Sequence, residues 1–235
     1  MRIYKNFKEA HSEILRDIVE MGIIVRPKTM QDKNIEGNTD YETYELQNYI
    51  YTVTNPKLSD LTPVQPWADL EFTERINPPL NPGTAWKQRA EVWTEFMHDY
   101  SGNNKPTFSY TYGERINHYQ GLDRIIGHLK KDPGSRQLFL SVWDPEDIQV
   151  LGTNRVPCTL GYIFQARPRN IDGIPKLDIT YLIRSNDFIT HFQNDVYLTH
   201  RLQKYVADQV GLEVGNFTHF AASLHIYRKD GKGVF

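Results

Sequence analysis

The chain begins with a helical pattern of apolar residues and continues into a polar stretch. Apolar residues between Phe7 and Ile18 recur every three or four positions, and this spacing predicts an amphipathic helix. Gly22 follows the last apolar turn, and we expect it to cap the helix in the left-handed conformation. The segment IIVRP then predicts a short strand, and the polar residues from Lys28 to Thr39 are typical of a surface loop.

The middle of the chain is interrupted by prolines before two helical patterns appear. Prolines between positions 63 and 82 predict that regular structure there is short. The run AWKQRAEVWTEFMHDY, which starts at Ala85, has helical spacing and predicts one helix. A second helix is predicted from Ile116 through NHYQGLDRIIGHLKKDPGSR, where DPG is a stop signal, and QLFLSVW follows as a strand.

The second half of the chain carries the strongest strand patterns. CTLGYIFQARP and KLDITYLIR both predict strands, and alternate residues from Leu177 to Ile183 are apolar and face one side. A long helix is predicted from about Asn194 to Val210, ending at Gly211, and FTHFAASLHIY closes as a strand. We therefore expect an α+β fold: a single domain, residues 1–235, with a mixed, mostly late-sequence sheet packed by helices.

Composition and charge narrow the function classes. The 235 residues are 39% hydrophobic and 24% charged, with a net charge of -2, which suits one core without disulfides or a structural metal. Non-specific nucleic-acid binding needs a surplus of Lys and Arg, so we expect a small-molecule partner and no direct nucleic-acid binding. No apolar segment has signal-peptide or membrane-span length, and we expect a soluble, cytoplasmic protein.

Common catalytic and metal motifs are absent from the chain. It has no GxxxxGK[ST], GxGxxG or GxSxG segment. This absence argues against a P-loop nucleotide-binding protein, a dinucleotide-binding protein and a serine hydrolase. Cys158 is the only cysteine, so the chain offers no paired thiolates, and its histidines lack the spacing of metal ligands. We expect no metal cofactor and a reducing environment.

Three short segments carry candidate chemistry, and each also fits an ordinary structural role. Cys158 follows a proline at a strand start, where a lone cysteine is commonly a small buried apolar residue. Arg184 and Ser185 could clamp a phosphate at a strand end, or lie in solvent. His225 and Tyr227 project from one strand face and could equally be half-buried structural residues.

The order and spacing of these segments resemble a known family. PCT, then RSND with FQND beyond it, then SLHIY resemble the thymidylate synthase and nucleotide hydroxymethylase family. YTYGERI and LDRIIGHLKKDPGSRQ extend the resemblance, which covers Phe108 to Tyr227 well and the earlier residues only loosely. The resemblance implies a thymidylate synthase-like fold and a sheet-mediated homodimer.

The resemblance implies a covalent mechanism. In this family a cysteine thiolate, at the position of Cys158, adds to the 6-carbon of a pyrimidine nucleotide, and the 5-carbon then attacks the one-carbon unit of methylenetetrahydrofolate. We expect Arg184 to lower the thiol pKa toward neutrality. Tyr112 matches a tyrosine near the proton that leaves the 5-carbon. Glu71 in DLEFTE is our choice for the glutamate that orders water, with Asp69 as the competing choice.

The resemblance also implies contacts to the phosphate. Arg184 and Ser185 match the family's phosphate-binding pair, and Arg136 matches an arginine that reaches the phosphate bound by the partner subunit. The family commonly has a second arginine where this chain has Gln137. Arg26 matches the mobile phosphate contact of the family's first loop.

The sugar and the folate have their own candidates. His225 and Tyr227 match residues that hydrogen-bond the sugar 3′-hydroxyl, and Asp187 matches a carboxylate at the folate ring. Trp86, or in its place Trp93, is expected to flank the folate, and both tryptophans could instead be surface or core residues.

Asp195 indicates the base. Relatives that use uracil carry Asn at this position, because an amide can donate to the carbonyl at ring position 4 and accept from the ring NH. Cytosine reverses both demands, which suits a carboxyl group that accepts from the exocyclic amine and shares a proton with the ring nitrogen. With Asn186 and Thr159, Asp195 resembles the deoxycytidylate (dCMP) hydroxymethylase branch. A solvated helix-cap aspartate is the other interpretation of Asp195.

The leading interpretation is thus a homodimeric enzyme that converts dCMP to 5-hydroxymethyl-dCMP through a Cys158 adduct. A thymidylate synthase or dUMP hydroxymethylase is the first alternative, and the residues leave a methyl or hydroxymethyl product open. A second alternative is a catalytically silent homologue that binds a nucleotide or a partner protein. It is motivated by Gln137, the unaligned glutamate and the early end of the chain at Phe235, where relatives continue with a segment that closes over the folate.

Overall fold

A mixed β-sheet is the largest feature of the computed structural model, which describes residues 1–31, 33–99, 102, 105–168 and 173–233. Within that part the sheet has seven strands in the order β1-β5-β9-β8-β7-β6, and β2 also pairs with β5. The pairs β1–β5 and β8–β9 are parallel and the others antiparallel. The strands are β1 (Arg2–Tyr4), β2 (Ile23–Val25), β5 (Thr43–Val53), β6 (Phe139–Ser141), β7 (Thr159–Pro168), β8 (Pro175–Asp187) and β9 (Glu213–Tyr227), and the separate hairpin is β3 (Thr29–Met30) with β4 (Lys33–Asn34).

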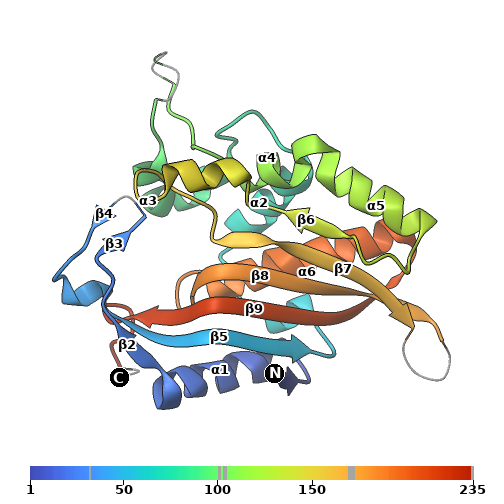
Figure 1. Cartoon of the computed structure of the whole chain (residues 1–235), viewed down its shortest axis with the longest axis horizontal. Helices are drawn as coiled ribbons and strands as arrows, with labels where there is room; N and C mark the ends of the chain where they lie inside the picture. Colours follow the sequence, from blue (N-terminus) through green and yellow to red (C-terminus); the bar gives the residue numbers. More distant parts are fainter. Residues whose placement is uncertain (32, 100–101, 103–104, 169–172, 234–235) are drawn as a thin grey trace.

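Helices cover one face of this sheet and leave the face toward the viewer bare in Figure 1. They are α1 (Phe7–Met21), α2 (Trp67–Ile76), α3 (Ala90–Trp93), α4 (Tyr112–Asn117), α5 (Gly121–Lys131) and α6 (Phe192–Val210). Short 3-10 turns lie at Thr39–Tyr41, Leu58–Asp60, Ala85–Arg89, Thr94–Phe96, His118–Gln120 and Pro145–Val150.

The core lies between the sheet and the helices. Alternate residues of β8 from Leu177 to Ile183 are buried there, which confirms the predicted alternation. Phe7 of α1 packs edge-on against Phe217 of β9, with 5.1 Å between the ring centres. Burying a side chain of this kind stabilises the fold by roughly 1.5–3 kcal/mol. The fold is therefore the expected α+β arrangement of a mixed sheet packed by helices.

Strand register brings distant residues together at one end of the sheet. The parallel pairing of β8 and β9 sets Asp187 beside His225. On the other side of β8, the Arg184 N–H donates to the carbonyl of Cys158 at 2.9 Å, where the β7–β8 register shifts. Helix α6 starts close after β8 and returns Asp195, in its first turn, to the same end. Three strands and one helix thus converge there.

Most predicted elements are confirmed, with three corrections. The helix expected from Ile116 is not continuous: it is interrupted at His118–Gln120, where Tyr119 has φ 53°, and resumes as α5. Gly211 caps α6 in the left-handed conformation with φ 72°, whereas Gly22 has φ -62° and an extended backbone. Gly22 is instead needed because a Cβ there would lie 2.3 Å from the carbonyl oxygen of Ile18. The single helix expected from Ala85 is wrong: the segment breaks at Arg89, with φ -142°, and continues as the short helix α3 and a 3-10 turn. The buried guanidinium of Arg89 lies over the Trp67 ring, 5.1 Å from the ring centre.

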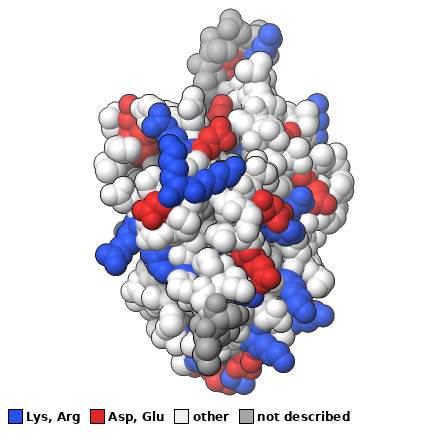
Figure 2. Space-filling model, turned by 90° about the vertical axis from the view of Figure 1, so that its right-hand side faces the viewer, with Lys and Arg blue, Asp and Glu red and all other residues white. Residues whose placement is uncertain are grey.

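The surface carries both signs of charge. Figure 2 shows Lys and Arg lying close to Asp and Glu on the face it presents. In the described part of the chain, no helix combines the length and the apolar character that a bilayer crossing requires.

Candidate active site

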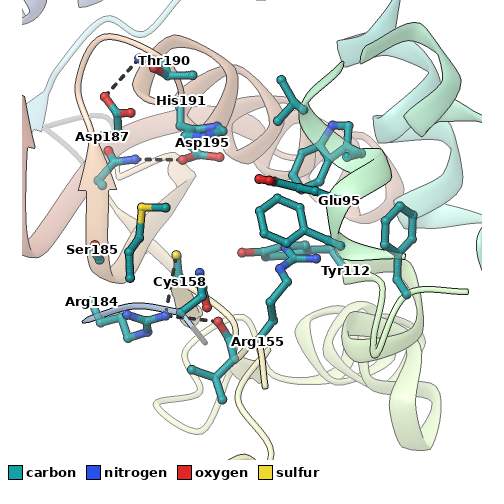
Figure 3. Close-up of a pocket in the computed structure, with 18 of the residues that line it drawn as sticks. Glu95, Tyr112, Arg155, Cys158, Arg184, Ser185, Asp187, Thr190, His191 and Asp195 are labelled. Atoms are coloured by element: carbon teal, nitrogen blue, oxygen red, sulfur yellow. Dashed lines mark hydrogen bonds between the residues drawn. The ribbon is translucent and has the colours of Figure 1, made fainter. Parts of the chain in front are cut away.

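A cavity of about 820 Å³ opens where the strands converge. Its walls come from the ends of β8 and β9, from α2 to α4, and from the loop before β7. The predicted site residues that line it are Glu71, Trp86, Tyr112, Cys158, Arg184, Ser185, Asp187, Asp195, His225 and Tyr227. The cavity therefore gathers residues that lie far apart in the sequence, and Figure 3 shows several of them facing one another.

Cys158 lies at the centre of this group, at the start of β7 (Figure 3). The Arg184 Nη2 lies 3.8 Å from the Cys158 Sγ. Burial raises the pKa of the thiol, and the charges of Arg184 and Arg155 counter only part of that effect. The expected low thiol pKa is therefore wrong for this structure, because loss of solvation outweighs the neighbouring guanidinium.

Arg184 is held mainly by the loop that carries the cysteine. Its Nε donates to the carbonyl of Pro157 at 3.0 Å, and its Nη2 donates to the carbonyl of Val156 at 3.1 Å. Trp143 Nε1 also donates to the Pro157 carbonyl, at 2.8 Å. These bonds fix the backbone just before Cys158, and they leave Nη1 of Arg184 as the nitrogen without an acceptor among the described residues.

Tyr112 and Glu71 reach the cavity from two helices in close contact. A Cβ on Gly113, beside Tyr112, would lie 2.5 Å from the Glu74 carbonyl oxygen, so only glycine allows α4 to approach α2 this closely. Arg75 joins the two side chains: it pairs with Glu71 at 2.9 Å and lies 4.4 Å above the Tyr112 ring centre. Burial raises the pKa of Tyr112 well above its usual value, so this phenol stays protonated at neutral pH.

Asp195 faces the cavity beside Asn186, which is 1% exposed. The Asn186 Nδ2 donates to Asp195 Oδ2 at 2.8 Å (Figure 3), while the buried Asn186 Oδ1 has no partner in the described part of the chain. Burial raises the pKa of Asp195, against the lowering effect of His191, Arg75 and the Asn186 hydrogen bond. The carboxyl group is thus more readily protonated than an aspartate in water, and it is not a solvated cap.

The neighbouring acidic residue, Asp187, also stabilises the backbone between β8 and α6. Its Oδ1 accepts from the backbone N–H of Ile189 at 3.0 Å and of Thr190 at 3.1 Å, which shapes the turn into α6. On β9, His225 Nδ1 lies 3.1 Å from the Ser223 hydroxyl, and its ring meets Tyr227 edge-on. Burial lowers the pKa of His225, which favours the neutral ring.

Three candidates lie outside the cavity. The exposed Arg136 is in the turn after α5, and the guanidinium of Arg26 pairs with Glu42 at 2.7 Å. Asp69 accepts from the Tyr197 hydroxyl at 2.7 Å and pairs with Arg201. The geometry therefore favours Glu71 over Asp69 as the cavity carboxylate, and the phosphate contacts expected of Arg26 and Arg136 stay predictions.

Aromatic side chains form the wall opposite β8, and sequence analysis found only part of it. Trp86 and Trp93 both line the cavity, and the indole N–H of each is buried without a partner among the residues that the structure describes. Phe96, Tyr110 and Arg155 complete this wall. The segment after Ala85 does not form the single helix that its pattern predicts, so the sequence did not show that its aromatic side chains share one wall. No sequence motif includes Arg155. Such a wall suits a flat ring system with polar edges.

The fold is shared with solved thymidylate synthases. Thymidylate synthase A from Bacillus subtilis matches with a TM-score of 0.72 and 19% identity, over 97% of this chain and 82% of that chain. The enzyme from phage T4 matches with a TM-score of 0.68 and 18% identity, over 95% of this chain and 78% of that chain. At these identities the likeness establishes the architecture alone.

Sequence comparison establishes the family. The thymidylate synthase family model matches residues 81–234. A protein of Methanosarcina barkeri named "Putative thymidylate synthase" is 32% identical over 228 residues, which is 92% of this chain and 94% of the relative. A Methanosarcina mazei protein of the same name is 30% identical over 223 residues, 90% and 92% of the two chains. The chain belongs to the thymidylate synthase family.

Proposed function

We propose that this protein transfers a one-carbon unit from methylenetetrahydrofolate to the 5-carbon of a pyrimidine deoxynucleoside monophosphate, with Cys158 as the nucleophile. The supporting observation is the placement of a lone thiol beside a guanidinium, 3.8 Å away, in a cavity that also contains the base-reading and sugar-binding candidates. The partnerless indole N–H groups and the flat aromatic wall fit a folate ring. The folate supplies the carbon.

The proposed reaction begins when the Cys158 thiolate adds to the 6-carbon and electron density moves to the 5-carbon, which bonds to the incoming carbon. Arg184 stabilises the thiolate through its contact with Sγ. A proton then leaves the 5-carbon near Tyr112, and the bond between the transferred carbon and the folate nitrogen breaks, which releases tetrahydrofolate and leaves an exocyclic methylene group on the 5-carbon. Glu71 orders water in the cavity. Water adds to the exocyclic methylene group, and the bond between sulfur and the 6-carbon breaks. The product is a 5-hydroxymethyl nucleotide, and the thiolate is regenerated.

The base we propose is cytosine. Asp195 Oδ2 is occupied by Asn186, and its pKa is raised by burial, so the carboxyl can share a proton with the cytosine ring nitrogen. Its remaining acceptor capacity suits the exocyclic amine. Uracil presents a ring NH and a carbonyl at these positions, and a buried polar mismatch is costly.

Replacing the nucleophile tests the mechanism. We expect Cys158→Ser to abolish turnover and to leave nucleotide binding within a few-fold of the parent protein, because Ser is far less nucleophilic and nearly the same size. Release of the 5-hydrogen and binding of dCMP would be measured on the same preparations. Persistent turnover in the serine variant would exclude this nucleophile.

Replacing the base reader tests substrate choice. We expect Asp195→Asn to move the ratio of kcat/KM for dCMP and dUMP toward dUMP by about 10- to 100-fold, since an amide meets the demands of uracil. Asn186→Ala is the matched variant, because it removes the partner and keeps the carboxyl group. A ratio that Asp195→Asn leaves unchanged would show that Asp195 does not face the base.

The second candidate function is synthesis of thymidylate from dUMP. The names of the archaeal relatives favour it over a hydroxymethylase. In that reaction hydride, rather than water, reaches the methylene group. The two functions share Cys158 and its addition step, so their products distinguish them.

We also propose that the active protein is a homodimer that forms through the bare face of the sheet. Leu182 and Phe220 are half-buried on that face, as are other apolar residues of β7 and β9. An exposed apolar sheet face of this kind commonly marks an association surface. Arg136, which lies outside its own cavity, would then contact the phosphate bound by the partner.

A further inference from the structure

Arg155 is a cavity residue that the proposed mechanism does not use. It lies three positions before Cys158 in the loop that leads into β7, and Figure 3 shows it on the side of Cys158 opposite Ser185. The backbone of this loop is fixed on both sides: the Asn154 Oδ1 accepts from the Arg155 N–H at 2.8 Å, and the Val156 carbonyl accepts from Arg184. These hydrogen bonds position the backbone from which the Arg155 side chain extends.

Aromatic rings hold the guanidinium group of Arg155 in place. Its central carbon lies 4.3 Å from the ring centre of Phe96, 5.4 Å from that of Tyr110 and 5.5 Å from that of Trp93. Each distance is within the range of a cation–π interaction. Such a cage orients the planar guanidinium group and excludes water from its faces. The N–H donors at its edges are then the part of the group that can bind a ligand.

The edges of this guanidinium group have no protein acceptor. Among the described residues, none accepts a hydrogen bond from it or pairs with it, and its Nε is buried. Glu95, an acidic residue that also lines the cavity, is already paired with Lys33 at 2.6 Å. A buried donor without an acceptor is costly, and a planar fork of donors matches a carboxylate or phosphate.

The position of Arg155 favours a carboxylate on the co-substrate. The candidate phosphate residues, Arg184 and Ser185, lie across Cys158 from it, whereas Arg155 stands among the aromatic rings that suit a flat ligand (Figure 3). Burial raises the pKa of Tyr110 and of Cys158, and the charge of Arg155 opposes both shifts, so Arg155 acts on both the aromatic wall and the nucleophile.

We propose that Arg155 binds a carboxylate group of the folate co-substrate and so selects a carboxylated pterin from uncarboxylated ones. This assignment rests on the proposed function, because it takes the aromatic half of the cavity as the folate site. Arg155 is then a specificity-determining residue, and its guanidinium–carboxylate pair forms only when the co-substrate is bound.

Equilibrium binding of tetrahydrofolate, measured by calorimetry with saturating dCMP and again with dUMP, tests the assignment. We expect Arg155→Gln to weaken tetrahydrofolate binding about 10- to 100-fold, because a charge-assisted bidentate contact is lost. Arg155→Lys should recover part of the affinity, since it keeps the charge without the fork. Arg201→Gln is the matched control: Arg201 also lies over aromatic rings, those of Phe72 and Tyr197, but it pairs with Asp69 outside the cavity, and we expect no change.

Two further probes identify the oxyanion. The affinity of 6-methyltetrahydropterin, which lacks the benzoylglutamate carboxylates, should be the same in the parent protein and in Arg155→Gln. The ratio of dCMP to deoxycytidine affinity should also be unchanged. A loss of that ratio in Arg155→Gln would assign the arginine to the phosphate and overturn the proposal.

The remaining outcomes also decide the matter. Unchanged tetrahydrofolate affinity in Arg155→Gln, or an equal loss for 6-methyltetrahydropterin, would show that Arg155 only supports the wall. A parent protein that binds tetrahydrofolate with neither nucleotide would refute the proposed function itself, and the role of Arg155 with it.

Discussion

At the scale of single residues, the protonation of Cys158 controls the first chemical step. Burial holds the pKa of its thiol above the ordinary value, so the free protein carries mainly the thiol at neutral pH. We expect the rate of alkylation by iodoacetamide to rise as pH increases, with a midpoint above that of an exposed cysteine. Arg184→Gln should move the midpoint higher still, because the guanidinium lowers this pKa.

Mass spectrometry of the alkylated protein over a series of pH values measures this midpoint, and Cys158→Ser is the blank. A midpoint below that of free cysteine would contradict the account. It would mean that the charges of Arg184 and Arg155 outweigh burial, whereas the sequence alone predicts an effect of Arg184 only.

Single residues also show what the sequence could and could not predict about the site. The cysteine, the RSND segment and the HIY segment could be recognised from their order, whereas the strand register that places Asp187 beside His225 could not. Arg155 has no such signal, because its surroundings come from rings on the broken segment and on the chain before α4. The effect of burial on the Cys158 pKa also depends on packing that no local pattern encodes.

At the scale of elements, the contact between α2 and α4 positions Glu71 and Tyr112. We expect Gly113→Ala to destabilise the protein by about 1–3 kcal/mol, because its Cβ would lie 2.5 Å from the Glu74 carbonyl oxygen and the two helices would have to separate. Turnover should fall with it, since Tyr112 moves with α4.

Gly127→Ala is the matched control for this prediction. It lies within α5, where a Cβ meets nothing within 4 Å, and alanine should stabilise the helix by about 0.5–1 kcal/mol. Urea unfolding of both variants provides the comparison. Equal stabilities for the two variants would show that α4 does not need a close approach to α2.

Two of the elements that were not predicted from the sequence are β5 and α2, and a physical reason explains each case. Strand β5 was overlooked because its buried positions do not alternate: Leu46 is followed by a polar stretch, and Tyr51, Thr52 and Val53 are all buried. Helix α2 starts directly after Pro66, within a region whose prolines predicted only short structure. By contrast, β8 and α6 have one consistent period each, and both were predicted close to their ends.

At the scale of the whole molecule, the proposed dimer makes each cavity depend on two chains. We expect Arg136→Ala and Cys158→Ser each to be nearly inactive alone, because one lacks the phosphate contact and the other the nucleophile. A mixed dimer has one cavity in which both residues are intact. Unfolding and refolding the two variants together should therefore restore up to about a quarter of parental activity, by random assortment.

Refolding each variant alone is the control, and size-exclusion chromatography with light scattering reports the assembly. Phe220→Glu, on the bare sheet face, should give a monomer with little activity. Activity that does not recover in the mixture would show that Arg136 acts within its own chain or not at all.

The central claim is that the cavity transfers a one-carbon unit to a cytosine nucleotide. Mass spectrometry of dCMP and dUMP, each incubated with the purified protein and methylenetetrahydrofolate, tests it most directly, with Cys158→Ser as the control. We predict a gain of CH2O on dCMP that the control lacks. A gain of CH2 on dUMP would establish a thymidylate synthase and contradict the role given to Asp195, and no gain on either nucleotide would contradict the catalytic account as a whole.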